Sequence, residues 1–236
     1  LHRRLARLEA DQGAGLFEKG PGGYRLTVVG EALLPHAEEA EEAVLAGSRA
    51  VRGHDRQAAG EVRLTLTNDL LGLLAPLLLA FRDAHPRITV LLSARDRVLD
   101  LGRQADVALR LGPTPPESTV GRKIGPVGWA RYGPSNDAPW MAYLGFERVP
   151  RPLAPPLLCV DTVGGMAALL ACTRGQGWLP CFVGDGTLQR LSDPVEIGDH
   201  FWALVHADLR RAARVRTLLD FLVPELLGCR ARLAGL

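Results

Sequence analysis

The stretch EVRLTLTNDLLGLLAPLLLAFRDAHPRITVLLSA, Glu61 to Ala94, changes its hydrophobic period twice. Residues 61–69 carry apolar side chains at every second position, which is typical of a half-buried strand. Residues 70–86 follow with an apolar pattern at helical spacing that stops at a proline, and residues 87–94 return to a strand pattern. A strand–helix–strand unit of this kind predicts an α/β fold with a parallel sheet.

The same alternation continues to the end of the chain. The sequence predicts a short helix at 97–104, a strand at 105–112, extended segments at 120–134 and 139–145, an irregular stretch at 147–156, a strand, helix and strand within 156–180, a strand at 201–208 and a helix at 210–227. Repeated strand–helix units are the pattern of an α/β domain.

A different pattern precedes this region. LFEKGPGGYRLT, Leu16 to Thr27, predicts two short strands joined by a tight turn, with Lys19 on one arm and Arg25 on the other. The residues before it, 1–11, predict a helix with leucines on one face and arginines on the other. A ribbon this small is not stable alone, so we expect it to lean on that helix.

A long helix is expected next, from Val28 to about Arg52, with Thr27 as its cap and a bend at Pro35. Residues 53–60 are small and polar, which indicates a linker. The helix carries a stripe of small apolar side chains: Ala32, Leu33, Ala37, Ala40, Ala43 and Val44. Such a stripe needs a partner, and a second copy of the chain is the simplest one.

Composition narrows the class of protein. The chain has 236 residues, 47% hydrophobic and 23% charged, which allows a real core in one or two domains. The net charge of +2 is too small by itself to argue for a polyanionic partner. No stretch is apolar and long enough for a bilayer, and no export leader opens the sequence, so we expect a cytoplasmic protein without a membrane partner.

No enzyme motif stands out. The sequence has no nucleophile elbow, zinc-protease pair, Walker loop or dinucleotide fingerprint, and its histidines are scattered. The four cysteines, Cys159, Cys172, Cys181 and Cys229, form no C-x-x-C pair and read as reduced thiols, with a redox or metal role as the alternative. We therefore expect no catalytic residues, no metal and no cofactor.

RRLARLEADQGAGLFEKGPGGYRLTVVGEALLPHA, residues 3–37, resembles the end of the winged helix-turn-helix domain of LysR-type transcriptional regulators. The matching features are the helix ending in Leu8-Glu9, Gly13, the run 16–19, the run 25–27 and Gly30-Glu31. The resemblance implies a recognition helix and wing in residues 1–27 and a linker or dimerisation helix in 28–59. Family members carry two further helices upstream, so we expect the sequence to start inside a helix.

The rest of the chain resembles the family's effector-binding domain. LLAPLLLAFRDAHPRITVLL, ADVALRLG, GQGWLP and HADLRRAARVRTLLDFL carry this likeness. The fold class implied is α/β: a partial winged helix-turn-helix and long linker helix followed by a two-lobed periplasmic-binding-protein-like (type 2) effector domain at 61–236. Lobe I would comprise 61–125 and 207–236, and lobe II 126–206, joined by two crossover strands.

The resemblance implies double-stranded operator DNA as one partner. The candidate DNA-binding residues are His2, Arg3, Arg4, Arg7, Lys19 and Arg25. A helix in the major groove needs cationic or hydrogen-bonding side chains on one face, and wing cations add phosphate contacts. The alternative is that the arginines form an ordinary solvated face.

The second implied partner is a small-molecule effector between the lobes. Strand ends and helix N-termini converge there, and free N–H groups favour carboxylates. The candidates are Thr67, Asn68, Ser93, Arg95, Arg110, Trp129, Tyr132, Asp161 and Thr162. Each has a structural alternative: Asn68 (or its neighbour Asp69) and Asp161 suit helix caps, Trp129 suits the core, and Arg95 suits the surface. Arg110 is the first choice because it could meet an acid group bidentately.

Three functions remain open from the sequence. The first is a bacterial-type, sequence-specific DNA-binding regulator that responds to an effector as a homodimer or homotetramer. The second is a truncated relative, deficient in DNA binding, that keeps effector binding and dimerisation. The third, a stand-alone solute-binding protein, is disfavoured by the basic helix and wing.

Overall fold

The computed structural model describes residues 2–20, 23–53, 57–94, 101, 105–115 and 119–236. The chain divides into two compact units, Leu1–Val51 and Arg52–Leu236. The helix predicted at 97–104 lies, apart from Leu101, outside the described residues. No helix in the described part combines the length and hydrophobicity needed to span a bilayer.

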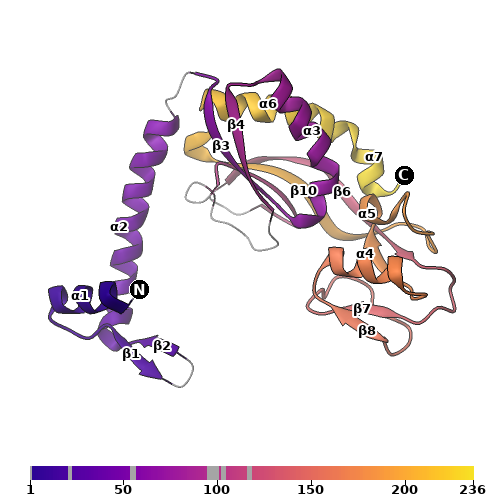
Figure 1. Ribbon diagram of the computed structural model, residues 1–236, viewed down its shortest axis with the longest axis horizontal. Helices are drawn as coiled ribbons and strands as arrows, with labels where there is room; N and C mark the ends of the chain where they lie inside the picture. Colours follow the sequence, from indigo (N-terminus) through magenta and orange to yellow (C-terminus); the bar gives the residue numbers. More distant parts are fainter. Residues whose placement is uncertain (1, 21–22, 54–56, 95–100, 102–104, 116–118) are drawn as a thin grey trace. The chain divides into compact units, whose positions relative to one another are not determined.

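The first unit has the predicted order of elements (Figure 1). It comprises α1 (His2–Gln12), β1 (Phe17–Gly20), β2 (Gly23–Leu26) and all but the last two residues of α2 (Val28–Gly53). Gly13 ends α1 with a φ of 66°, the left-handed exit that glycine tolerates. Pro35 lies inside α2, as expected.

The second unit is built on one mixed sheet of six strands, ordered β4-β3-β5-β10-β6-β9. Its strands are β3 (Gly60–Leu66), β4 (Ile88–Ala94), β5 (Val107–Gly112), β6 (Thr119–Tyr132), β9 (Gly177–Pro180) and β10 (Val195–His206). The parallel prediction is confirmed for β3 with β4 and β5. The β5–β10, β10–β6 and β6–β9 pairs are antiparallel.

The remaining elements surround this sheet. They are η1 (Asn68–Leu70), α3 (Leu71–Ala84), the parallel pair β7 (Met141–Tyr143) and β8 (Leu158–Val160), α4 (Val163–Cys172), α5 (Cys181–Gly184), η2 (Ala207–Leu209), α6 (Ala213–Gly228) and α7 (Arg230–Ala234). The long strands β6 and β10 pair with each other, and β10 also pairs with β5 while β6 also pairs with β9.

One part of the main core lies between one face of the sheet and the helices α3 and α6, which lie side by side (Figure 1). Leu64, Leu66 and Leu109 of the sheet are at most 1% exposed on this side. Phe81 of α3 meets Phe221 of α6 edge-on, with ring centroids 5.4 Å apart. Alternation along each strand sends the intervening residues to the other face of the sheet.

Several boundaries differ from the sequence predictions. A 3-10 turn precedes α3, so neither Asn68 nor Asp69 caps that helix, and its N-cap is Leu70. The helices α5 and α7 were not predicted, and β10 starts six residues before its predicted start at 201. Short helices escape period-based reading because one turn carries too few apolar positions to define a face.

Candidate functional site

The hairpin is fastened to α1 by one carboxylate. The Oε1 atom of Glu9 accepts the N–H groups of Leu16 at 2.8 Å and of Phe17 at 3.0 Å. Leu16 is only 2% exposed, which makes it the one fully buried leucine among the described residues at this junction. The hairpin therefore leans on α1, as the sequence predicts.

Thr27 joins the hairpin to α2. Its Oγ1 atom accepts the N–H of Gly30 at 3.1 Å and donates to the carbonyl oxygen of Gly15 at 2.7 Å. Its own N–H donates to the carbonyl oxygen of Leu16 at 3.0 Å. The predicted cap is confirmed, and the same side chain also closes the turn that follows α1.

The cations of α1 are solvent-exposed. Arg3, Arg4 and Arg7 are all exposed, and their spacing places them within one side of the helix. Arg7 has Asp11 at 4.0 Å, but both side chains are well exposed, so this pair contributes little. The side chain of His2 lies outside the described part of the chain.

The strand register separates the two cations of the hairpin. Glu18 stands opposite Arg25, and Lys19 stands opposite Tyr24. Because directly opposed residues share a face of a ribbon, Lys19 and Arg25 project from opposite faces. A duplex that lay along one face of the hairpin would meet only one of these two cations.

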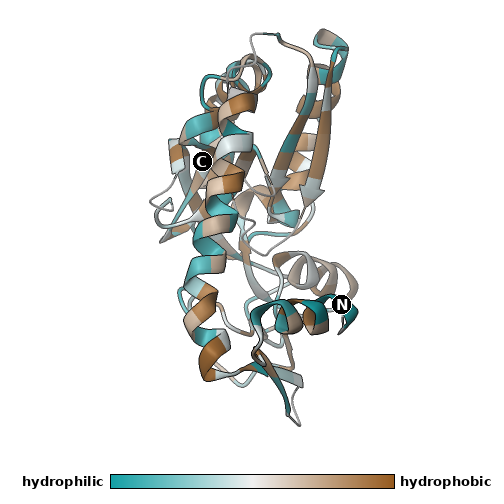
Figure 2. Cartoon of the chain, turned by 90° about the vertical axis from the view of Figure 1, so that its left-hand side faces the viewer, coloured by the Kyte–Doolittle hydropathy of each residue, from teal (hydrophilic) through white to brown (hydrophobic). Residues whose placement is uncertain are grey.

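Along α2, apolar and small side chains follow a seven-residue repeat. Val44 and Val51 are 71% and 77% exposed, and Ala37 lies one repeat earlier. Figure 2 shows hydrophobic and hydrophilic bands alternating along this helix. Most of the predicted stripe is exposed in the single chain, namely Ala32, Ala37, Ala40, Ala43 and Val44.

In the second unit, three expected effector residues lie on one face of the sheet. Ser93 pairs with Thr65, and Leu66 pairs with Leu109, which places the extended Thr67 beside Arg110. These polar side chains lie on the face opposite the α3–α6 core. Parallel strands thus bring together residues that are far apart in sequence.

Two polar groups on this face are buried. Arg110 is 9% exposed, and its Nη2 atom donates to Oγ1 of Thr65 at 2.9 Å. The Oγ1 atom of Thr67 is buried and has no hydrogen-bond partner among the described residues. Buried polar atoms normally have partners, so an unpaired hydroxyl at a strand end is suited to a ligand. Asn68 is exposed beside it, and Arg95 lies outside the described residues.

The expected residues of α4 divide between two roles. Thr162 is the N-cap, and its Oγ1 atom accepts the N–H of Gly165 at 3.1 Å. Asp161 is exposed and precedes the cap, so the cap role considered for Asp161 belongs to Thr162. The backbone of Thr162 takes part as well, since its carbonyl oxygen accepts the N–H of Met166 at 3.1 Å.

Trp129 and Tyr132 are internal. Trp129 is 3% exposed and its ring lies edge-on to Tyr143. Tyr132 is fully buried, its hydroxyl donates to Asp185 at 2.6 Å, and burial raises its pKa well above the usual value. The expected role of Tyr132 as a ligand wall finds no support here because its ring and hydroxyl are both engaged.

A polar cluster around Asp185 was not anticipated. Arg190 binds both carboxylate oxygens of Asp185, at 3.1 and 2.5 Å, and donates to the carbonyl oxygen of Gly235 at 2.8 Å. The cluster joins β6, the end of α5 and the C-terminal residues. Asp185 and Arg190 are close in sequence, but nothing in the sequence around them signals that Arg190 also binds Gly235, which lies 45 residues away.

No group of three or more His, Cys, Asp or Glu side chains arranged to hold a metal occurs in the part of the chain that is described. The four cysteines are free: Cys159 and Cys172 are exposed, Cys181 is buried and Cys229 is partly buried. Burial raises the pKa of the Cys181 thiol, which keeps it protonated and unreactive.

Comparisons with known proteins match the family that the sequence resembles. Residues 55–130 match the family described as the LysR substrate binding domain. The probable HTH-type transcriptional regulator LtrA of Klebsiella pneumoniae is 28% identical over 127 residues, which are 53% of this chain and 41% of that protein. An HTH-type transcriptional regulator of Xanthomonas campestris pv. campestris (strain 8004) is 30% identical over 125 residues, or 52% of this chain and 36% of that protein. The matches thus span about two-fifths of these relatives.

Solved structures extend the likeness to the first unit. The full-length structure of AphB, a virulence activator of Vibrio cholerae, has a TM-score of 0.63 at 19% identity, and the match covers 94% of this chain and 88% of that one. CrgA, a LysR-type transcriptional regulator from Neisseria meningitidis, has a TM-score of 0.62 at 21% identity, with coverage of 95% and 88%. These findings confirm the resemblance and the fold class: residues 55–130 match the LysR substrate binding domain, and the fold of the chain is that of the solved LysR-type regulators.

Proposed function

We propose that this chain, a relative of the LysR-type regulators, binds double-stranded DNA through residues 1–27 and a small-molecule effector through residues 61–236. Residues 28–59 would join two copies into a homodimer, or two dimers into a homotetramer. The protein would act in the cytoplasm, because its proposed partner is the DNA of a bacterial cell. The single observation that carries this proposal is the fold, because full-length regulators match nearly all of the chain, both units included.

The exposed arginines support DNA binding. Arg3, Arg4 and Arg7 form one cationic side of α1, and Glu9 on the same helix fixes the wing beside it. Cationic side chains on one helix face and a braced wing are the parts a major-groove reader needs. On the wing, only one of Lys19 and Arg25 can face the phosphates at a time, so we assign them unequal roles.

The sheet face supports effector binding. Arg110 and Thr67 offer a guanidinium and an unpaired hydroxyl at the ends of adjacent strands, and Ser93 adds a hydroxyl from β4. A carboxylate is the ligand group that suits a guanidinium best. Thr162 and the first turn of α4 would form the second wall, since helix N-termini favour anions. This assignment makes 61–125 with 207–236 one lobe and 126–206 the other.

The experiment that tests DNA binding uses the 236-residue chain. Duplexes selected from genomic fragments would be titrated by fluorescence anisotropy at several salt concentrations. The double variant Arg4→Ala/Arg7→Ala should bind about tenfold or more weakly, and its salt slope should fall by about 0.9 for each phosphate that the variant no longer neutralises. The matched control, Arg174→Ala/Arg211→Ala, removes two exposed arginines of the second unit and should bind normally.

The alternative function predicts another result. A DNA-binding-deficient effector and dimerisation module would give no selected duplex, while ligands would still stabilise the second unit. Equal binding by the α1 double variant and its control would reject the groove assignment for α1.

A further inference from the structure

The sheet of the second unit narrows where its two long strands pass from one end to the other. β10 pairs with β5 at one end and β6 pairs with β9 at the other, while the stretch between these ends holds together by β6–β10 pairing. That pairing is interrupted, because residues 197–199 of β10 stand opposite Val127, and Gly198 has a φ of 86°. A bulge of this kind bends its strand and disrupts the ladder of hydrogen bonds. We call this narrow part the neck; it comprises residues 125–128 and 196–199.

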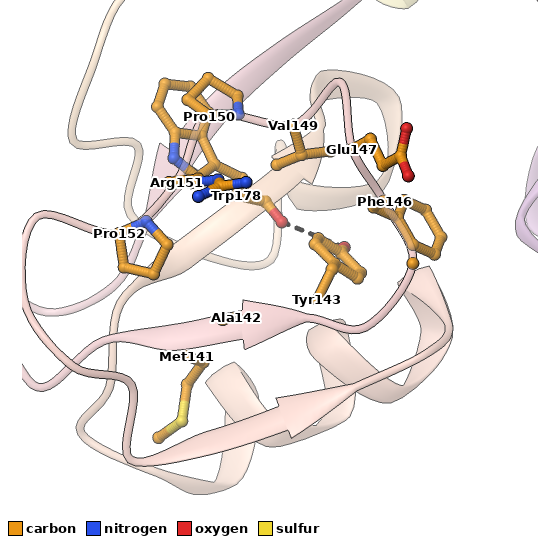
Figure 3. Close-up of a pocket in the computed structure, with 11 residues that line it drawn as sticks. Met141, Ala142, Tyr143, Phe146, Glu147, Val149, Pro150, Arg151, Pro152 and Trp178 are labelled. Carbon is orange, nitrogen blue, oxygen red and sulfur yellow. Dashed lines mark hydrogen bonds between the residues drawn. The ribbon is translucent and has the colours of Figure 1, made fainter.

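Each end of the sheet is braced by contacts of its own. At the β5 end, the Nε atom of Arg214 in α6 donates to the carbonyl oxygen of Glu61 in β3 at 2.9 Å. At the β9 end, the Tyr143 hydroxyl of β7 donates to the carbonyl oxygen of Trp178 in β9 at 3.1 Å, beside a pocket (Figure 3). Two braced bodies that are joined by a weak neck can rotate about it as about a hinge. The angle between them therefore depends on what else crosses the neck.

The C-terminal helix α7 crosses the neck in contact with the backbone of β6 (Figure 1). The Nε atom of Arg230, the first residue of α7, donates to the carbonyl oxygen of Ile124. A Cβ atom at Gly128 would be 2.1 Å from the carbonyl oxygen of Ala234, the last residue of α7, so this approach requires a glycine. Leu233 is fully buried, which shows that the helix is packed down over the neck.

The two ends of α7 are fastened to different ends of the sheet. At its start, Cys229 alone separates α7 from α6, which belongs to the β5 end. Beyond its last residue, the carbonyl oxygen of Gly235 accepts from Nη1 of Arg190 at 2.8 Å. Arg190 is held by Asp185 and forms a bridge with Tyr132 of β6, which pairs with β9. The helix and Gly235 therefore link the two braced bodies across the neck.

We propose that α7 and Gly235 form a strap that fixes the angle between the two ends of this sheet. Arg190 is partly exposed and Arg230 is exposed, so the fastenings can open without unfolding either end. The two ends also meet where η1 approaches α4, and rotation about the neck would alter that contact. The inference goes beyond the proposed function, because it concerns motion within the second unit and requires neither DNA nor an effector.

Double electron–electron resonance between two spin labels measures this angle in the full chain. One label attaches to Cys172, exposed at the end of α4, and the other to Arg82→Cys, an exposed position of α3. Cys159→Ser and Cys229→Ala remove the other reachable thiols, since Cys181 is buried. The labels report on opposite ends because α3 contacts β4 and α4 contacts β9. This labelled parent should give one narrow distribution of distances.

Arg190→Met/Arg230→Met keeps both side-chain stems and removes both fastenings. Its distance distribution should be broader than that of the parent. Amides 196–201 should exchange about fivefold faster, the factor expected for the net loss of one hydrogen bond. The matched control, Arg211→Met/Arg232→Met, makes the same change of charge at two exposed arginines, one of them in α7, and should behave as the parent.

Gly128→Ala tests the strap without touching either arginine, because its Cβ atom displaces the end of α7. It should also broaden the distribution, whereas Gly228→Ala, with nothing within 4 Å of its Cβ atom, should not. The inference is overturned if either strap variant is folded by circular dichroism and keeps the distribution of the parent. It is also overturned if the control double variant broadens the distribution equally. If Gly128→Ala does not fold, the arginine double variant decides alone, and either overturning result leaves the proposed function standing.

Discussion

Gly30 of α2 lies against the backbone of Leu16: a Cβ atom at Gly30 would be 2.2 Å from the Leu16 carbonyl oxygen. That oxygen also accepts the N–H of Thr27. The close approach lets the first turn of α2 pack on the residue that begins the hairpin. Any side chain at position 30 must push the two backbones apart, although the Thr27 hydroxyl ties Gly30 to Gly15, the residue before Leu16.

Gly30→Ala should therefore loosen the first unit. We expect a loss of about 1–3 kcal/mol of local stability, the usual cost of forcing extra atoms into a packed contact. Hydrogen exchange at the amides of Leu16 and Phe17 would report it as reduced protection. Gly47→Ala on the same helix is the control, because nothing lies within 4 Å of a Cβ there. It should gain up to about 1 kcal/mol from helix propensity. Equal protection in both variants would contradict the close-contact argument.

Val44→Lys should disrupt self-association through α2. Val44 is 71% exposed in the single chain and lies at the centre of the seven-residue repeat with Ala37 and Val51. A lysine at the centre of such a seam would bury a charge in a dimer. Light scattering during gel filtration should show the molar mass falling toward that of one chain. Glu38→Lys adds a lysine well off the seam and should keep the parent mass. A Val44→Lys dimer as stable as the parent would reject this seam.

Thr65→Val should destabilise the second unit. The Thr65 hydroxyl accepts from the buried guanidinium of Arg110 at 2.9 Å, and valine keeps the volume but removes the acceptor. Removing the acceptor of a hydrogen bond from a buried guanidinium costs about 1–3 kcal/mol. Urea unfolding should show a lower midpoint with an unchanged slope. Thr65→Ser retains the hydroxyl and should lose much less stability. Equal losses of stability in the two variants would mean that packing rather than the hydrogen bond matters here.

Tyr132→Phe should change the alkaline end of the stability profile. Burial and the Asp185 hydrogen bond raise the pKa of Tyr132 above the unfolded value of 10.0. Above pH 10 the unfolded chain releases this proton and the folded chain keeps it, so stability is full below pH 10 and falls as pH rises. The free energy of unfolding should fall by about 1.4 kcal/mol per pH unit from this group once the pH is above about 10. That contribution should vanish in Tyr132→Phe, and identical slopes would assign the titration to another group.

Much of the local structure follows from the sequence. The strand and helix patterns of 61–94 predict β3, α3 and β4 because side-chain periodicity directly reports which face of an element is buried. Thr27 was identifiable as the cap of α2 because capping depends on neighbours within three residues. The position of Thr67 at a strand end was equally clear, since β3 stops one residue earlier.

Only the tertiary structure decided how these elements combine. The register of β1 with β2 placed Lys19 and Arg25 on opposite faces, which residue types alone do not reveal. Tyr132 met Asp185, 53 residues away, and Thr65 met Arg110, 45 residues away, because the strand order set by the whole chain brings them together. Periodicity states which face of an element is buried, but not what it is buried against. The crossing of α7 over β6 therefore became visible only in three dimensions.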